Sequence, residues 1–374
     1  MTKHNPNNER IKRKYLIFMK EARQQQEATI DAIAKAINRF ENYTKFRDLK
    51  SFHFEQAVGF KKHLAKQCNQ RTGDKLSKAT LNSTLRQLKA FFQWLSMQAG
   101  YKSRINYPDA EYFNLSENDV RVAMAKRIQP VPTIEQIKHV ITSMPSGTSL
   151  EKRNRCLVAF ILATGGRDSA IASLKLKHVD LVLGSVFFDA REVKTKFSKT
   201  FTSHFFPVGD EVLGIISGWI AYLRDERLWG NDDPLFPSTD VRQGKDKTFE
   251  AVDIKKEHWS TASPIRKIFK EAFEGAGLSY FNPHSFRKTL VMLGEKACQT
   301  PEEFKAWSQN MGHEGVLTTF FSYGEVQPTR QAEIIKQLGK PREIDSQKID
   351  MKSMAKVLAS EMAKQNMQNG INHD

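Results

Sequence analysis

Apolar side chains recur at steps of three and four residues through much of the first third of the chain. This is the pattern of helices that bury one face. The repeat is regular over residues 30–40 and 81–95. Ser77 precedes the second repeat and Ser116 precedes a further short one, and serine is a favoured residue at a helix N-cap. Lysines and arginines occupy many polar positions between the apolar stripes. We therefore predict a basic helical domain over residues 25–128.

The first 24 residues carry a dense run of positive charge. Arg10, Lys12, Arg13 and Lys14 lie close together in a mostly polar segment. We predict a basic N-terminal extension over residues 1–24, either a frayed helix or an arm that lies near nucleic acid. A solvated N-terminal tail accounts for the same composition.

Two prolines separate the basic helical region from the rest of the chain. The sequence Gln-Pro-Val-Pro at residues 129–132 disfavours helix, because proline lacks an amide donor and fixes φ. It predicts a short extended linker. Helical patterning resumes at Thr133, a good N-cap. The nearly continuous apolar run over residues 150–164 predicts a well-buried helix, which Gly165 and Gly166 end.

Beyond Gly184 the apolar pattern changes from helical to strand-like. Residues 186–188 and 200–208 predict two strands, joined through a turn at residues 194–199. Residues 231–259 are polar and irregular, and they predict a surface loop. The fold class that follows is mainly α with a small β-sheet.

A second domain is predicted over residues 133–340, followed by a helical C-terminal tail over residues 341–374. Apolar residues in the tail lie at helical spacing. The tail packs either on its own domain or on a neighbouring subunit, and the sequence does not separate these alternatives.

Charge points to a polyanionic partner. The 374 residues include 58 Lys and Arg against 42 Asp and Glu, so the net charge is +16 and the pI is about 9.6. Nucleic acid is the commonest such partner, although a basic soluble protein has the same balance. Cys68, Cys156 and Cys298 are far apart, so they predict neither a disulfide framework nor a zinc site, as suits a reducing cytoplasm. The N-terminus lacks a signal-peptide pattern, and the longest apolar run is too short to span a membrane.

The most informative stretch runs from Asn282 to Tyr323. Asn282 and Pro283 suit the N-cap and the first position of a helix. His284 and Arg287 would then share one face of its first turn. A helix N-terminus that presents a cation and an imidazole is suited to bind a phosphate. The stretch therefore indicates phosphoryl transfer on nucleic acid.

A wider set of residues, in the same order along the chain, resembles the motifs of the tyrosine recombinase (phage integrase) family. The matching residues are Ala163-Thr164-Gly165-Gly166-Arg167 with Leu174, Lys194-Thr195, His284-Ser285-Phe286-Arg287, Gly312-His313 and Tyr323. Each motif alone occurs by chance in many chains, whereas the ordered set is specific. The resemblance covers most of residues 133–335. It implies a helical core-binding domain that binds DNA, followed by an α+β catalytic domain.

The resemblance also implies a reaction. Tyr323 would attack a DNA phosphodiester and form a covalent 3′-phosphotyrosine, which conserves the bond energy so that the strand can be resealed. Arg167 and Arg287 would bind the non-bridging oxygens, because a guanidinium stays charged and donates two bonds to one phosphate.

Proton transfer would fall to the remaining matched residues. Lys194 would protonate the leaving oxygen, with Lys196 and Lys199 as alternatives on the same turn. His284 and His313 would hydrogen-bond the phosphate or assist the proton transfers. The scheme needs no metal and no cofactor.

The implied function is site-specific recombination in the integration or excision of a mobile element, or in the resolution of replicon multimers. The partners would be double-stranded recombination sites and further copies of the chain in a tetrameric synapse, with accessory DNA-bending proteins as candidates and no membrane. The implied location is the bacterial cytoplasm, in association with the nucleoid. Two alternatives stay open: a sequence-specific DNA-binding protein with a decayed active site, and a type IB topoisomerase or telomere resolvase.

Two positions depart from the family pattern. The carboxylate that commonly follows the first arginine by three residues is replaced by Ala170, and Asp168 lies nearer. The family tyrosine usually follows the Gly-His histidine by nine residues, whereas Tyr323 follows by ten and Ser322 is ninth. We retain Tyr323 as the nucleophile, because a serine nucleophile would abandon the rest of the pattern.

Overall fold

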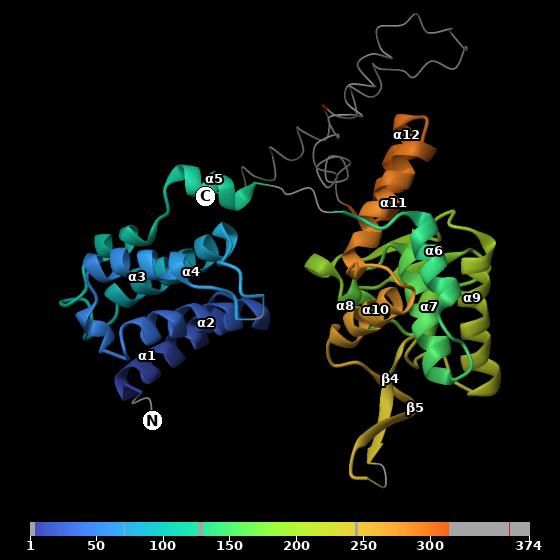
Figure 1. The fold of residues 1–374 in the computed structure, drawn as a ribbon, viewed down its shortest axis with the longest axis horizontal. Coiled ribbons are helices and arrows are strands. Elements are labelled where there is room, and N and C mark those ends of the chain that lie inside the picture. The colour runs from blue at the N-terminus through green and yellow to red at the C-terminus, as the bar shows by residue number, and fades with distance from the viewer. Residues whose placement is uncertain (1–3, 71, 126–129, 244–245, 314–358, 360–374) are drawn as a thin grey trace, which may run out of the picture. The chain divides into compact units, whose positions relative to one another are not determined.

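The computed structural model describes residues 4–70, 72–125, 130–243, 246–313 and 359. The chain divides into two compact units, Met1–Arg127 and Ile128–Asp374, and Figure 1 shows the helices and strands of each. Each unit has its own hydrophobic core. The predicted tail falls outside the described residues except at position 359. Tyr323 also falls outside them.

The regular elements in the described part of the first unit are all helices, apart from an isolated β-bridge between Cys68 and Lys75. Its α-helices are α1 (Pro6–Ile17), α2 (Glu27–Tyr43), α3 (Phe54–Lys66), α4 (Lys78–Ser96) and α5 (Glu117–Met124). Short helical turns lie at Phe18–Ala22, Leu49–Ser51 and Tyr107–Phe113. The predicted serine caps are confirmed, because the Ser77 and Ser116 hydroxyls accept hydrogen bonds from the amides of Thr80 and Asp119.

Phenylalanine rings fill the centre of this unit. Phe40, Phe60, Phe92 and Phe113 are all buried. The rings of Phe52 and Phe92 stack with their centroids 3.8 Å apart, and most of the neighbouring pairs meet edge to face, the other arrangement that aromatic quadrupoles favour. The unit therefore has a tightly packed core on which basic helices can be displayed.

The first helix belongs to this core. Ile11 and Tyr15 of α1 are buried. Asn8 donates a 3.1 Å hydrogen bond to the buried Glu41 carboxylate, which Lys12 also pairs with. The prediction of a frayed helix, an arm or a solvated tail is therefore wrong for residues 6–17. The buried face of α1 consists mainly of Ile11 and Tyr15, one turn apart among charged residues, and this apolar pattern is too short to predict a packed helix.

The second unit is built around α7, whose last nine residues are all buried. Its α-helices are α6 (Ile134–Ser143), α7 (Ser149–Thr164), α8 (Asp168–Ile171), α9 (Asp210–Ala221), α10 (Ser263–Gly275), α11 (Pro283–Ala297) and α12 (Pro301–Asn310). Short helical turns lie at Leu176–His178, Lys196–Ser198 and Tyr222–Glu226. In the part of the chain that the structure describes, no helix is both long and apolar enough to cross a bilayer.

A small antiparallel sheet packs beside α7. Its strands are β1 (Val179–Asp180), β2 (Ser185–Phe188) and β3 (Phe201–His204), in the order β1-β2-β3. Phe188 lies opposite Phe201 in the β2–β3 register. The predicted fold class, mainly α with a small β-sheet, is confirmed. The connection between β2 and β3 carries the lysines of the predicted turn.

A second hairpin projects from this unit (Figure 1). Strands β4 (Pro237–Gln243) and β5 (Phe249–His258) pair antiparallel, with Val241 opposite Ala251. The prediction of an irregular loop over residues 231–259 is therefore wrong for residues 237–243 and 249–258. Most positions on both faces of this ribbon are exposed or half-buried, so its sequence lacks the alternating pattern of a packed strand.

Candidate active site

The abrupt end of α7 forms one wall of the candidate site. Gly165 has φ +61°, the left-handed conformation that ends helices and that glycine adopts without strain. The Gly166 amide donates a 3.1 Å hydrogen bond to the Thr164 hydroxyl. This tight turn places Arg167 directly after the stop, at the N-cap of α8.

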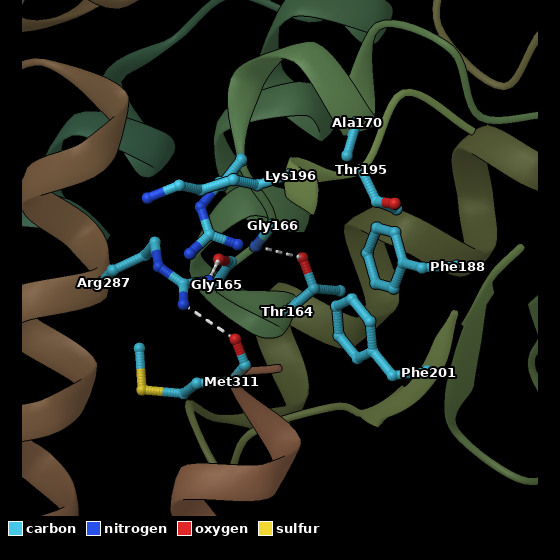
Figure 2. A pocket seen from close by; sticks show the side chains of 11 residues that line it. Thr164, Gly165, Gly166, Ala170, Phe188, Thr195, Lys196, Phe201, Arg287 and Met311 are labelled. Atoms are coloured by element: carbon cyan, nitrogen blue, oxygen red, sulfur yellow. Dashed lines mark hydrogen bonds between the residues drawn. The ribbon is translucent and has the colours of Figure 1, made fainter. Parts of the chain in front are cut away.

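Arg287 reaches this turn from α11. Its side chain is buried, and its Nη1 donates to the Gly165 carbonyl. Its Nη2 donates to the Met311 carbonyl at 2.7 Å and to Nε2 of His313 at 2.9 Å. Figure 2 shows the guanidinium between the two carbonyls. One arginine thus joins the end of α7 to the end of α12.

Arg167, Arg287 and Lys196 line one small recess at this junction. Figure 2 labels Arg287 and Lys196 at this recess. No carboxylate lines the recess among the residues that the structure describes. Burial and the nearby Arg167 charge lower the pKa of Arg287 to about 9, and burial also lowers the pKa of Arg167. Two guanidinium groups in a recess that no described carboxylate lines make a positive site that favours an anion.

Both predicted histidines lie in the same positive field. Burial, followed by the charges of Arg287 and Arg167, lowers the pKa of His313 to about 4. The ring is therefore neutral near pH 7. Because a guanidinium can only donate, Nε2 of His313 accepts, and the ring proton belongs on Nδ1. Desolvation and the same two arginines also lower the pKa of His284, at the start of α11.

The turn that carries the predicted lysines reaches the recess through Lys196 and not through Lys194, the residue that matches the family motif. Lys196 lines the recess, whereas the Lys194 side chain is exposed and is not among the lining residues. The Lys194 amide donates to the Ser173 hydroxyl at 2.9 Å. Lys199 lies near enough for its charge to lower the pKa of His313. The identity of the proton donor stays a prediction.

Thr195 is a site residue that the sequence did not single out for a role. Thr195 lines the recess, and its Oγ1 is buried and has no hydrogen-bond partner within the described ranges. A hydroxyl in this position can donate to an oxygen that enters the recess. The only signal in the sequence was its place directly after Lys194.

The carboxylate of Asp168, the residue after Arg167, pairs with α10 and does not line the recess. Asp168 forms an ion pair with Arg266 of α10, with Nη2 and Oδ2 2.8 Å apart. Ala170, at the position where the family commonly has a carboxylate, lines the recess instead. The Asp168–Arg266 pair ties the start of α8 to α10, beside the candidate phosphate site.

The described residues contain no group of three or more His, Cys, Asp or Glu side chains that could hold a metal ion. Within these ranges, the structure brings together Arg167, Arg287, His284, His313 and the lysine turn.

Comparison with known proteins places the fold. Residues 132–326, more than half of the chain, match the model of the family described as the Phage integrase family. A tyrosine recombinase XerC of Lactobacillus leichmannii is 25% identical over 255 residues, covering 66% of this chain and 72% of that protein. A tyrosine recombinase XerC of Treponema denticola is 25% identical over 315 residues, covering 82% and 90%.

Solved structures share the fold at low sequence identity. A lambda integrase dimer bound to a COC′ core site matches with a TM-score of 0.58 and 14% identity, covering 87% of this chain and 85% of that one. The XerH site-specific recombinase bound to a palindromic difH substrate, in a post-cleavage complex, matches with a TM-score of 0.56 and 18% identity, covering 86% and 83%. At this identity the similarity concerns fold alone.

Proposed function

This chain belongs to the phage integrase family of tyrosine recombinases, and we propose that it recombines DNA site-specifically through a covalent 3′-phosphotyrosine intermediate. The observation that carries the proposal is the recess shared by Arg167 and Arg287. Two buried or half-buried cations in a recess that no described carboxylate lines are suited to a phosphodiester whose oxygens gain negative charge in the transition state.

The two arginines divide the work of binding this phosphate. Three of the five Arg287 donors bond Gly165, Met311 and His313. Within the described residues this leaves Nε–H and one Nη1–H for phosphate oxygens. The Arg167 side chain has no hydrogen-bond or ion-pair partner within the same ranges, so its whole fork is available. Arg287 is a fixed clamp and Arg167 the main donor.

The covalent step uses Tyr323 and a lysine. The Tyr323 hydroxyl gives its proton to a base, His284 or water, as its oxygen forms a bond to phosphorus and the bond to the 5′ oxygen breaks. That oxygen leaves as a hydroxyl by taking a proton from an ammonium on the 194–199 turn. Resealing reverses these transfers. Lys194 matches the family motif, and Lys196 lies nearer to the recess.

The proposed partners are duplex recombination sites and further copies of this chain. The +16 charge favours duplex DNA, and the lambda integrase relative was solved as a dimer on DNA. We extend this to a tetrameric synapse acting on DNA in the bacterial cytoplasm, at the nucleoid, with accessory DNA-bending proteins as candidates.

A covalent-trapping experiment tests the proposal. The target duplex is first selected by binding from a random pool and is then nicked near the presumed cut, so that the released fragment diffuses away. Wild-type protein should form an adduct that resists denaturation, and Tyr323→Phe should form none. Tight, sequence-specific binding without any wild-type adduct would instead identify a binding protein with a decayed site. An adduct that persists in Tyr323→Phe would overturn the choice of nucleophile.

A further inference from the structure

An aromatic ring stands in solvent directly beside the phosphate site. Phe197 is 79% exposed. The Nζ atom of Lys196 lies 4.7 Å from the centroid of its ring. Lys196 also lines the recess with Arg167 and Arg287. An apolar surface thus adjoins the cations that would hold the scissile phosphate.

The backbone of this turn holds the ring outward in a costly conformation. Phe197 has φ +60° and ψ +25°, and Ser198 has φ +51°. Left-handed backbone is unfavourable for any residue with a Cβ, and bulky residues adopt it rarely. None of residues 196–198 is buried, so local packing does not offset this strain. Strain of this kind persists mainly at functional sites.

Other strongly exposed apolar side chains of the second unit do not lie next to the recess. Phe249 on β5 is 78% exposed, but no residue of the β4–β5 ribbon lines the recess. Leu228 is 80% exposed and is likewise absent from the lining. The combination of exposed ring, left-handed backbone and adjacent phosphate-binding cations belongs to Phe197 among these residues.

We propose that Phe197 stacks on, or wedges beside, a base next to the scissile phosphate. This inference rests on the proposed function. The bases that flank a backbone phosphate lie one sugar away from it, so a phosphate held by Arg167 and Arg287 brings a base to the neighbouring turn. Aromatic side chains stack on any base, and apolar side chains inserted at a base step partly unstack it.

The proposed contact gives a sequence preference without hydrogen bonds to base edges. Pyrimidine–purine steps unstack most easily. Cleavage should therefore be favoured where such a step adjoins the cut, and Phe197 should be the residue that imposes this preference.

The decisive variant is Phe197→Gly, because glycine accepts the positive φ and removes only the ring. Phe197→Tyr keeps a stacking surface, and Phe249→Ala is the control for loss of an equally exposed phenylalanine. The substrate is the selected nicked duplex with 2-aminopurine next to the scissile phosphate. The readouts are the rate of adduct formation and the fluorescence change on binding.

Phe197→Gly should slow adduct formation by about ten- to a hundredfold, the range expected for loss of one base–aromatic stack. It should also abolish the fluorescence change, while Phe197→Tyr and Phe249→Ala stay within about threefold of wild type. Equal rates and equal fluorescence for wild type and Phe197→Gly would overturn the proposal. The fluorescence change needs only binding, so it tests the Phe197–base contact even if the wild-type protein forms no adduct. Absence of a wild-type adduct would contradict the proposed function and not this contact.

Discussion

Arg287 has both a structural and a proposed chemical role. Its hydrogen bonds to Gly165 and Met311 hold the ends of α7 and α12 together, and its side chain also lines the recess. Arg167 has no such protein contacts within the described residues. The two arginines should therefore respond differently to substitution, although both belong to one phosphate site.

Arg287→Lys should reduce both stability and activity. Lysine keeps the charge but cannot reach both carbonyls, and a buried carbonyl left without a donor costs about 1–3 kcal/mol. The rate of adduct formation should fall at least about a hundredfold, as for loss of a transition-state donor. Chemical denaturation and the trapping assay measure the two effects. Arg224→Lys, at an exposed arginine outside the site, is the control, and unchanged values for Arg287→Lys would contradict the clamp.

His313 should make the stability of the protein depend on pH. Its pKa falls from 6.5 to about 4 on folding, so between these values the unfolded state binds more protons than the folded state. The contribution of His313 to the free energy of unfolding should be constant above pH 6.5 and should fall by roughly 3 kcal/mol as the pH drops to about 4. His313→Gln should flatten that part of the profile. An identical slope in the variant would show that other groups cause it.

A comparison of two substrates with different leaving groups can identify the proton donor. Lys194→Ala, Lys196→Ala and Lys199→Ala should each be tested on a normal substrate and on one whose bridging 5′ oxygen is sulfur. A thiolate leaves without protonation, so only the variant that lacks the general acid should regain a rate close to that of wild type on the sulfur substrate. Equal defects on both substrates for all three would place the acid elsewhere.

At the scale of elements, glycine turns position the site. Gly312 has φ +67°, and a Cβ there would lie 2.7 Å from Cζ of Phe201. The turn after α12 therefore brings the Met311 carbonyl and His313 to Arg287 only while position 312 stays glycine.

Gly312→Ala should destabilise the second unit by at least about 1–2 kcal/mol, because the alanine is strained and clashes with β3. It should also slow adduct formation by displacing His313. Gly218→Ala in α9 is the matched control, since a Cβ there meets no atom within 4 Å. That change should be neutral or stabilising by up to about 1 kcal/mol. Equal stability of the two variants would argue against the role of the turn.

Elements with a local signal could be predicted from the sequence. The caps at Ser77, Ser116 and Thr133 are predicted from the residue types alone, and each side chain accepts the expected backbone hydrogen bond. The helix at Pro283 also begins where predicted, although the Asn282 side chain makes no cap bond. The β4–β5 ribbon could not be predicted, because backbone pairing rather than apolar burial holds it.

The site could be predicted only in part. Motif order selected Arg167 and Arg287, but no pattern shows that one is tied to two carbonyls and the other is not. The sequence ranked Lys194 first on its motif, whereas three-dimensional position favours Lys196. Such differences depend on how distant turns meet, which the spacing of residues does not encode.

At the scale of the whole molecule, the excess of positive charge should dominate the affinity for DNA. Binding should weaken steeply with salt, by about 10³–10⁵ between roughly 50 and 200 mM if six to ten phosphates are contacted. Titration of the selected duplex over this range measures the slope. Affinity that hardly changes with salt would contradict a phosphate-based grip.

The central claim is that Arg167 and Arg287 act together on one DNA phosphate. The direct test measures adduct formation by wild type and Arg167→Ala on a normal substrate and on one with a neutral methylphosphonate at the scissile position. Arg167→Ala is the better probe, because this side chain makes no hydrogen bond or ion pair within the described residues. The account predicts a loss of about 10²–10³-fold on the phosphate and little loss on the methylphosphonate. An equal loss on both substrates would show that Arg167 does not act on that charge.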